Sequence, residues 1–137
     1  MDKKEYRYIE EMKVRDYECD LQGVVNNANY LHYMEHARHE FLEAMGDNFQ
    51  RMHDEGIDAM VARIEIDYKE SLRSGERFWV GINFERQGVR HIFHQDVVRE
   101  RDGAICTRAK VHVVVLEQGK LTRGDYLADL FQKFGER

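Results

Sequence analysis

One long amphipathic helix, with no second long helix to pack against, is the feature that most limits how this chain can fold. Residues 28–45 place apolar side chains at steps of four, three, four and four, which makes one continuous stripe along a helix. Gly46 follows as a helix stop. Most of the chain after it has the alternating pattern of strands, so the stripe must be buried against a sheet. The stripe consists of Tyr30, Met34, Ala37, Phe41 and Met45.

The second half of the chain predicts four strands joined by short turns. Apolar and polar residues alternate within them, and in the first strand the even positions from Met60 to Tyr68 are expected to share one face. The pair Asp102-Gly103 is a tight hairpin signal, and turns this short make neighbouring strands antiparallel. In chain order the expected elements are a strand at 6–17, helices at 28–45 and 47–55, strands at 59–68, 77–86, 91–99 and 104–116, and a helix at 126–134.

This order of elements predicts an α+β fold in which an antiparallel sheet wraps around one central long helix. At 137 residues the chain is expected to form one domain that spans residues 1–137. A single sheet around one helix leaves strand edges unpaired, and edge-to-edge pairing with a second copy removes that problem. We therefore expect at least a homodimer.

Composition argues against several classes of function. The net charge is −5 and no arm or face is strongly basic, so we expect no nucleic-acid partner. No apolar run approaches the ~20 residues of a membrane span, and the N-terminus lacks the apolar core of a secretory signal. Cys19 and Cys106 lie far apart in the sequence, as expected of a reduced, cytoplasmic protein. Because CxxC and HExxH motifs are absent, we expect no metal and no cofactor.

An acidic loop that leads into the long helix is the strongest functional signal. The loop holds Asp20, turns at Gly23 and runs through a series of asparagines into the helix. A helix start offers backbone N–H groups without an intrahelical partner, and these can stabilise a developing oxyanion. A carboxylate beside them can act as a base or a nucleophile. The alternative is structural, since Asp20 also suits a turn. One of Asn26, Asn27 and Asn29 is expected to cap the helix, with Asn27 or Asn29 preferred.

The same segment resembles the hotdog-fold acyl-CoA thioesterases, in the branch of 4-hydroxybenzoyl-CoA thioesterase and the YbgC-like bacterial proteins. The resemblance rests on DLQGVVNNANYL at 20–31 and YMEHAR at 33–38, with a second match, IEIDYKESL, at 64–72. It runs from about Val14 to about Leu116. It implies a hotdog fold, an acyl-CoA substrate, and a site at the interface between the subunits of a homodimer or homotetramer.

The resemblance also implies roles for particular residues. The acid that aligns with Asp20 is the catalytic nucleophile, or the base that activates water. The backbone N–H at the position of Asn27 polarises the thioester carbonyl. Relatives often carry His there, so the role that carries over to Asn27 is that of its backbone. Substrate binding is assigned to Gly23, Val24, Tyr30 and Tyr68. Neither the acyl chain length nor a preference for aromatic acyl groups follows from these residues.

Three functions are compatible with this pattern. The first is hydrolysis of an acyl-CoA to a free acid and CoA, and the second is the same chemistry on an acyl carrier protein. The third is a non-catalytic protein that binds acyl-CoA. A hotdog dehydratase is disfavoured, because no His-Phe-Pro-Gly-like segment is present and the chain contains no proline.

Other polar side chains have structural interpretations that we prefer to functional ones. Glu35 is a candidate second acid, because another hotdog branch places its catalytic Glu on this helix, but a structural contact is preferred. His32, His36 and His39 have a spacing that suits a metal, yet they fit the polar face of the helix. Cys19 is interpreted as a small packed residue. Six arginines are interpreted as a solvated face, with those near Ser74 as candidates to contact CoA phosphates: Arg63, Arg73, Arg77, Arg86, Arg90 and Arg99.

Overall fold

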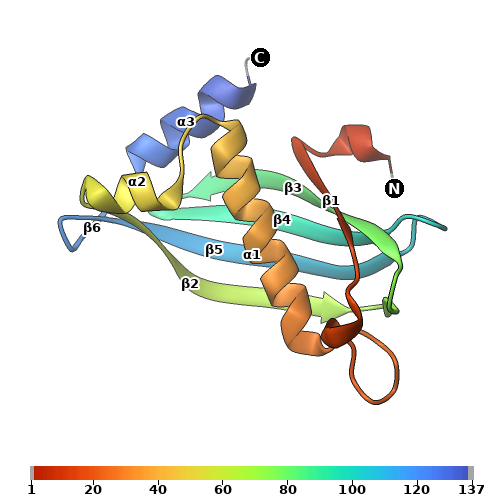
Figure 1. Ribbon diagram of the computed structural model, residues 1–137. Helices are drawn as coiled ribbons and strands as arrows, with labels where there is room; N and C mark the ends of the chain where they lie inside the picture. The colour runs from red at the N-terminus through yellow and green to blue at the C-terminus, as the bar shows by residue number, and fades with distance from the viewer. Residues whose placement is uncertain (1, 136–137) are drawn as a thin grey trace.

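The computed structural model describes residues 2–135, and its main feature is a curled antiparallel sheet crossed by one long helix (Figure 1). The strands are β1 (Tyr8–Lys13), β2 (Ile57–Tyr68), β3 (Arg77–Gln87), β4 (Arg90–Arg99), β5 (Ile105–Glu117) and β6 (Lys120–Thr122). Their order across the sheet is β1-β3-β4-β5-β2, and β6 pairs with the end of β5. All pairings are antiparallel, as the short turns predict. The edges of the sheet are therefore β1 and β2.

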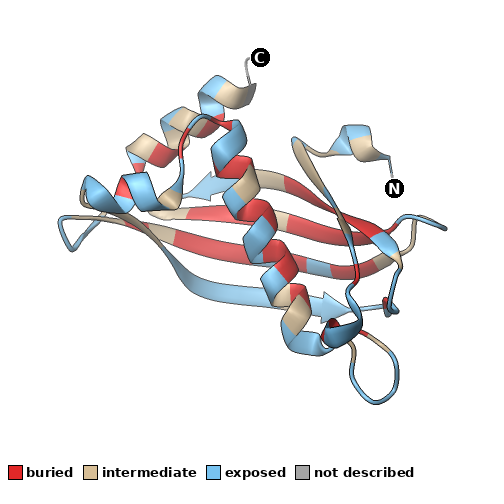
Figure 2. Cartoon of the chain, viewed as in Figure 1, coloured by how far each residue is buried: buried red, intermediate tan, exposed pale blue. Residues whose placement is uncertain are grey.

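The long helix α1 (Asn27–Ala44) packs its apolar stripe against one face of the sheet. The predicted helix at 28–45 is confirmed, with both ends one residue earlier than expected. Gly46 follows the C-cap residue Met45 and has φ +89°, a left-handed conformation that glycine adopts without strain. Figure 2 shows buried positions on α1 above the buried centres of β3, β4 and β5. All five predicted stripe residues are buried: Tyr30, Met34, Ala37, Phe41 and Met45.

Shorter helical segments surround this core. α2 (Phe49–Asp54) is capped by Asn48, whose side chain accepts a hydrogen bond from the Arg51 N–H at 2.7 Å. α3 (Asp125–Gly135) inserts Phe131 into the core, where its ring stacks on that of Phe41. The predicted strand at 6–17 is cut short, because the chain forms a 3₁₀ turn, η2 (Asp16–Glu18), after β1; another, η1, covers Lys3–Glu5. Within residues 2–135, no helix combines the length and apolarity needed to cross a bilayer.

β2 is an edge strand whose surface is mostly exposed, in contrast to β4 and β5 (Figure 2). Its register against β5 shifts between Val61 and Arg63, which is a β-bulge. The predicted even-numbered face is therefore wrong at the start of the strand. Val61 pairs with Val113 and Ile64 pairs with Val111, so Val61 rather than Met60 shares the α1 face with Ile64 and Tyr68.

Candidate active site

The loop before α1 closes on itself and presents Asp20 at its start. Cys19 and Val25 form an isolated antiparallel bridge. Inside it, the Asp20 N–H donates to the Val24 carbonyl at 2.9 Å, and the Gly23 N–H donates to the Asp20 carbonyl at 3.0 Å. Gly23 has φ +78°, so this tight turn requires a glycine at that position. The backbone of Asp20 is thus fixed from both sides.

A buried acid, Glu18, anchors this loop to the helix. Its carboxylate accepts hydrogen bonds from the Tyr33 hydroxyl at 2.9 Å and from the Arg15 N–H at 2.7 Å. Its carbonyl accepts from the Asn26 N–H at 3.0 Å. Burial and the neighbouring Glu18 carboxylate raise the pKa of Tyr33. Sequence reasoning missed Glu18, and the only available signal was an acid three residues after Arg15, which forms a capping box on η2.

The start of α1 leaves one backbone donor unused. Asn26 is the N-cap, and its side chain accepts from the Ala28 N–H at 3.0 Å. Its carbonyl accepts from the Asn29 N–H at 2.9 Å. One of the three candidate asparagines caps the helix as predicted, but the preference for Asn27 or Asn29 is wrong, because Asn27 is already helical and the Asn29 side chain donates to the Glu18 carbonyl. No residue within 2–135 accepts a hydrogen bond from the Asn27 N–H.

A cavity of about 220 Å³ brings the predicted residues together. The Tyr68 hydroxyl donates to the Asn27 carbonyl at 3.4 Å, and the Tyr30 hydroxyl accepts from the Leu72 N–H at 3.0 Å. The two tyrosine rings meet edge to face, with centroids 5.8 Å apart. Gly23 shapes the loop beside the cavity without lining it. The predicted residues that line the cavity are Asp20, Val24, Asn27, Tyr30 and Tyr68.

The Asp20 carboxylate is exposed and is oriented by Gln22. One oxygen accepts a hydrogen bond from the Gln22 N–H at 2.9 Å, and the Gln22 side-chain amide also lies within hydrogen-bond distance of the carboxylate. An exposed carboxylate and an unused N–H at a helix start therefore line the same cavity. This pair can accept a proton from water and stabilise an oxyanion, the two requirements for attack on an activated carbonyl.

The other candidate groups lie outside this cavity or lack the required chemistry. Glu35 is exposed, and His39 lies 3.8 Å from its carboxylate. Among residues 2–135, no cluster of three or more metal-ligating side chains occurs. Burial raises the pKa of the Cys19 thiol, which disfavours a reactive thiolate. Within the described residues 2–135, three of the six arginines form ion pairs: Arg63 with Glu65, Arg86 with Asp125 and Arg99 with Asp102.

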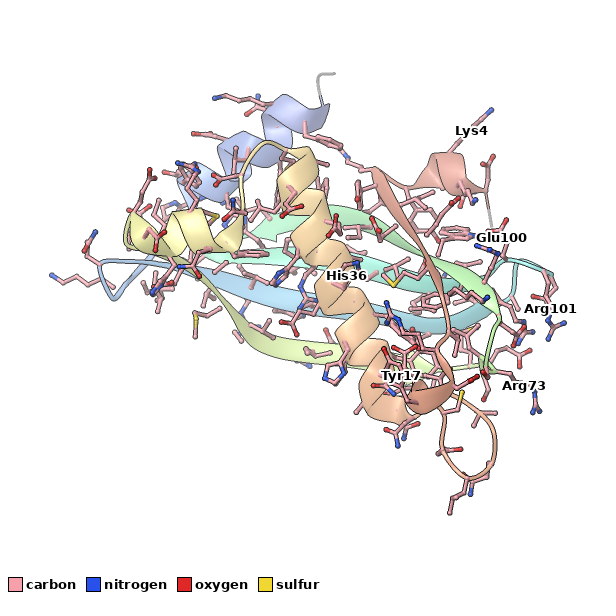
Figure 3. All side chains as sticks on the ribbon, viewed as in Figure 1. Lys4, Tyr17, His36, Arg73, Glu100 and Arg101 are labelled. Atoms are coloured by element: carbon pink, nitrogen blue, oxygen red, sulfur yellow. The ribbon has the colours of Figure 1, made fainter. Side chains whose placement is uncertain are left out.

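Among the six arginines, Arg73 lies beside the Asp20 loop. Its backbone forms a bridge with Val24, and in Figure 3 its side chain points outward beside the loop. Tyr17, at the start of the same region, is also exposed (Figure 3). Of the six arginines, Arg73 is therefore the one whose backbone pairs with the Asp20 loop, although it does not line the cavity.

Comparison with known proteins identifies the family. A model of the Thioesterase-like superfamily matches residues 14–130. The long-chain acyl-CoA thioesterase FadM of Escherichia coli is 30% identical over 108 residues, which cover 78% of this chain and 81% of FadM. The crystal structure of the probable thioesterase YbaW from Escherichia coli superposes with a TM-score of 0.80 at 27% identity, covering 92% of this chain and 97% of YbaW. The chain therefore belongs to the Thioesterase-like superfamily, and the predicted hotdog fold is confirmed.

A plant relative has higher identity over a shorter region. The chloroplastic acyl-acyl carrier protein thioesterase ATL3 of Arabidopsis thaliana is 46% identical over 70 residues. These residues make up 51% of this chain and 37% of ATL3, so the match spans little more than a third of the plant protein.

Proposed function

We propose that this protein is a thioesterase that hydrolyses an acyl-CoA to a free acid and CoA. The observation that carries the proposal is that the exposed Asp20 carboxylate and the unused Asn27 N–H line one cavity. Membership of the superfamily and the similarity to FadM support thioester chemistry. Val24, Tyr30 and Tyr68 form the walls that hold the thioester beside these groups.

The proposed reaction uses Asp20 as a general base. The carboxylate takes a proton from water while the oxygen of that water bonds to the thioester carbon. The carbonyl oxygen becomes an oxyanion that accepts a hydrogen bond from the Asn27 N–H, and the dipole of α1 favours this negative charge. The C–S bond then breaks, and the CoA sulfur leaves with the proton held by Asp20. Direct attack by Asp20, followed by hydrolysis of an acyl-Asp20 anhydride, is the alternative sequence of steps.

A second candidate is the same chemistry on an acyl carrier protein, which the similarity to ATL3 favours. The reacting thioester is identical in the two candidate substrates. They differ only in the carrier, CoA or a protein, that binds outside the cavity. Rates with one acyl group on CoA and on a carrier protein decide between them. A third candidate, an acyl-CoA-binding protein without catalysis, predicts binding with no release of thiol.

Replacing the catalytic acid tests the proposed function. Asp20→Asn keeps the shape of the side chain and removes the base, so we expect kcat/KM for acyl-CoA hydrolysis to fall at least about 100-fold. Asp129→Asn, at an exposed position on α3, is the matched control and is expected to retain full activity. Near-normal thiol release by Asp20→Asn would refute the assignment.

We further propose that a second copy of the chain pairs with the exposed edge of β2. This strand has 12 residues, and four of its large apolar side chains are 39–50% exposed: Met60, Val61, Ile64 and Tyr68. Long apolar edges of this kind promote strand pairing between chains. A two-fold pairing centred on Ile64 also places Arg63 opposite Glu65 of the partner subunit, at two symmetric positions.

The cellular location belongs to the proposal as well. Cys19 and Cys106 are both free thiols. Unpaired cysteines fit a reducing compartment, and we place the protein in the cytoplasm.

A further inference from the structure

Arg38 on α1 is a buried cation with most of its hydrogen-bonding capacity unused. The residue is 8% exposed, and one guanidinium nitrogen donates to the Gln95 side-chain oxygen at 2.9 Å. The Gln95 amide in turn donates to the Met34 carbonyl at 2.9 Å, which fixes the orientation of both side chains. Within residues 2–135, no carboxylate lies within 4.0 Å of the guanidinium. Burying an unpaired charge is costly, so this arrangement requires an explanation.

The guanidinium lines a cavity of about 270 Å³ that is distinct from the cavity at Asp20. Its walls come from α1, α2, α3 and three strands and are mixed in character, because Glu35, His39 and Asp58 line it beside apolar side chains. Burial lowers the pKa of Arg38 to about 10, so the side chain is still charged at neutral pH. The apolar lining residues are Phe49, Ala59, Val61, Phe93, Val113 and Leu127.

Pairing of two β2 strands about a two-fold axis brings the two cavities together across the interface. In an antiparallel pair, one end of a strand lies against the opposite end of its partner. Tyr68, the last residue of β2, lines the Asp20 cavity, and Val61, nearer the start of the strand, lines the Arg38 cavity. Val61 and Tyr68 pair with Val113 and Thr107, which point to the same face of β5, so both cavities open on the α1 face.

We propose that the acyl group bound at Asp20 of one subunit extends into the Arg38 cavity of the other, where the guanidinium selects acyl chains that carry an oxygen acceptor. This inference rests on the proposed thioesterase function and on β2 pairing. The apolar side chains of the lining contact the hydrocarbon, and an oxo, hydroxyl or carboxyl oxygen accepts hydrogen bonds from Arg38. An unsubstituted chain leaves the buried cation unpaired, which penalises that substrate.

Matched acyl-CoAs test the selection. Chains of equal length are compared as the saturated, 3-hydroxy, 3-oxo and ω-carboxy forms, and the form with the highest kcat/KM gives the position of the preferred oxygen. We expect the wild type to favour at least one oxygenated form over the saturated form by about 10-fold or more. Arg38→Met is expected to abolish this preference, with little loss of activity on the saturated chain. Arg101→Met, at an exposed position, is the matched control and is expected to keep the preference.

Mixed dimers test whether Arg38 acts across the interface. A mixture of Asp20→Asn and Arg38→Met chains forms heterodimers. If each site takes Asp20 from one subunit and Arg38 from the other, one of the two sites in a heterodimer contains both wild-type residues. We expect the mixture to have about a quarter of the wild-type activity on the preferred oxygenated substrate. This value is well above the mean activity of the two variant homodimers. If both residues act within one subunit, no site is intact and the mixture gives only that mean, which overturns the proposal.

The outcomes also separate this proposal from the one on which it rests. A wild-type protein that hydrolyses no acyl-CoA refutes the thioesterase function itself. A wild-type protein that hydrolyses saturated and oxygenated chains equally well refutes only the role of Arg38, and this result needs no variant to fold. Arg38→Lys provides a second variant that keeps the charge, and it is expected to retain part of the preference.

Discussion

At the scale of single residues, the candidate active site depends on side chains that the sequence predicts and on others whose role is visible only in the structure. Asp20 and Asn27 are close in sequence, so the spacing between an acid and a helix start was enough to predict that they lie together, and both line one cavity. Glu18 was missed, and Arg38 entered only as part of the YMEHAR match, because the burial of both side chains depends on residues distant in sequence, such as Tyr33 and Gln95. Arg38 does lie four residues after Met34, within the apolar stripe, and that position was the available signal.

The Glu18 anchor predicts a measurable loss of stability. Tyr33→Phe removes the hydroxyl that donates to the buried Glu18 carboxylate, so we expect the free energy of unfolding to fall by about 1–3 kcal/mol in urea denaturation. Tyr17→Phe is the matched control. Tyr17 is 80% exposed, so the loss of its hydroxyl should leave the free energy of unfolding unchanged. Equal stabilities of the two variants would show that the anchor contributes little.

His91 predicts a pH dependence of stability. It is buried beneath the start of α3, and burial lowers its pKa below the ordinary value of 6.5. The unfolded chain therefore takes up a proton more readily than the folded chain, and stability falls as the pH drops through 6.5 toward the lower folded value. Thermal melts of His91→Gln between pH 7.5 and 5.5 are expected to show a weaker loss than the wild type. A wild type and variant with parallel pH profiles would contradict this.

At the scale of elements, the periodicity of apolar residues predicted most of the helices and strands. It failed where the structure depends on how one strand pairs with another. The strands β3, β4 and β5 and the helix α1 lie within a residue or two of their predicted bounds, because each buries a regular face. The bulge at Val61–Arg63 was missed, since the extra residue is defined only by its pairing with β5. The three-residue strand β6 is too short to show alternation, and it exists because Lys120–Thr122 folds back onto the end of β5.

The proposed β2 interface predicts a change of oligomeric state. Ile64→Lys introduces a charge at the centre of the edge, where two copies of the new side chain would face each other. We expect light scattering at micromolar concentration to give a dimer or larger assembly for the wild type and a monomer for the variant. Leu121→Lys is the control, because Leu121 is 58% exposed on β6 and lies outside the interface. A wild-type monomer would overturn the interface.

At the scale of the whole molecule, the candidate active site lies where three parts of the fold meet: the Asp20 loop, the start of α1 and the end of β2 (Figure 1). The sheet buries one side of α1, and the Glu18 contacts fix its first turn. Because the helix start is held in this way, its unused N–H group is fixed in position before a substrate arrives. In the proposed mechanism, this backbone group supplies the oxyanion stabilisation.

A pair of substitutions at Asn27 tests that claim most directly. Asn27 is the first helical residue, where helices tolerate proline, and Asn26 has φ −64° and ψ 142°, a conformation compatible with a following proline. Asn27→Pro thus deletes the N–H with the helix retained, and we predict a fall in kcat for acyl-CoA hydrolysis of about 100-fold or more. Asn27→Ala keeps the N–H and is predicted to retain most of the activity. Equal kcat values for a folded Asn27→Pro and for Asn27→Ala would contradict the account.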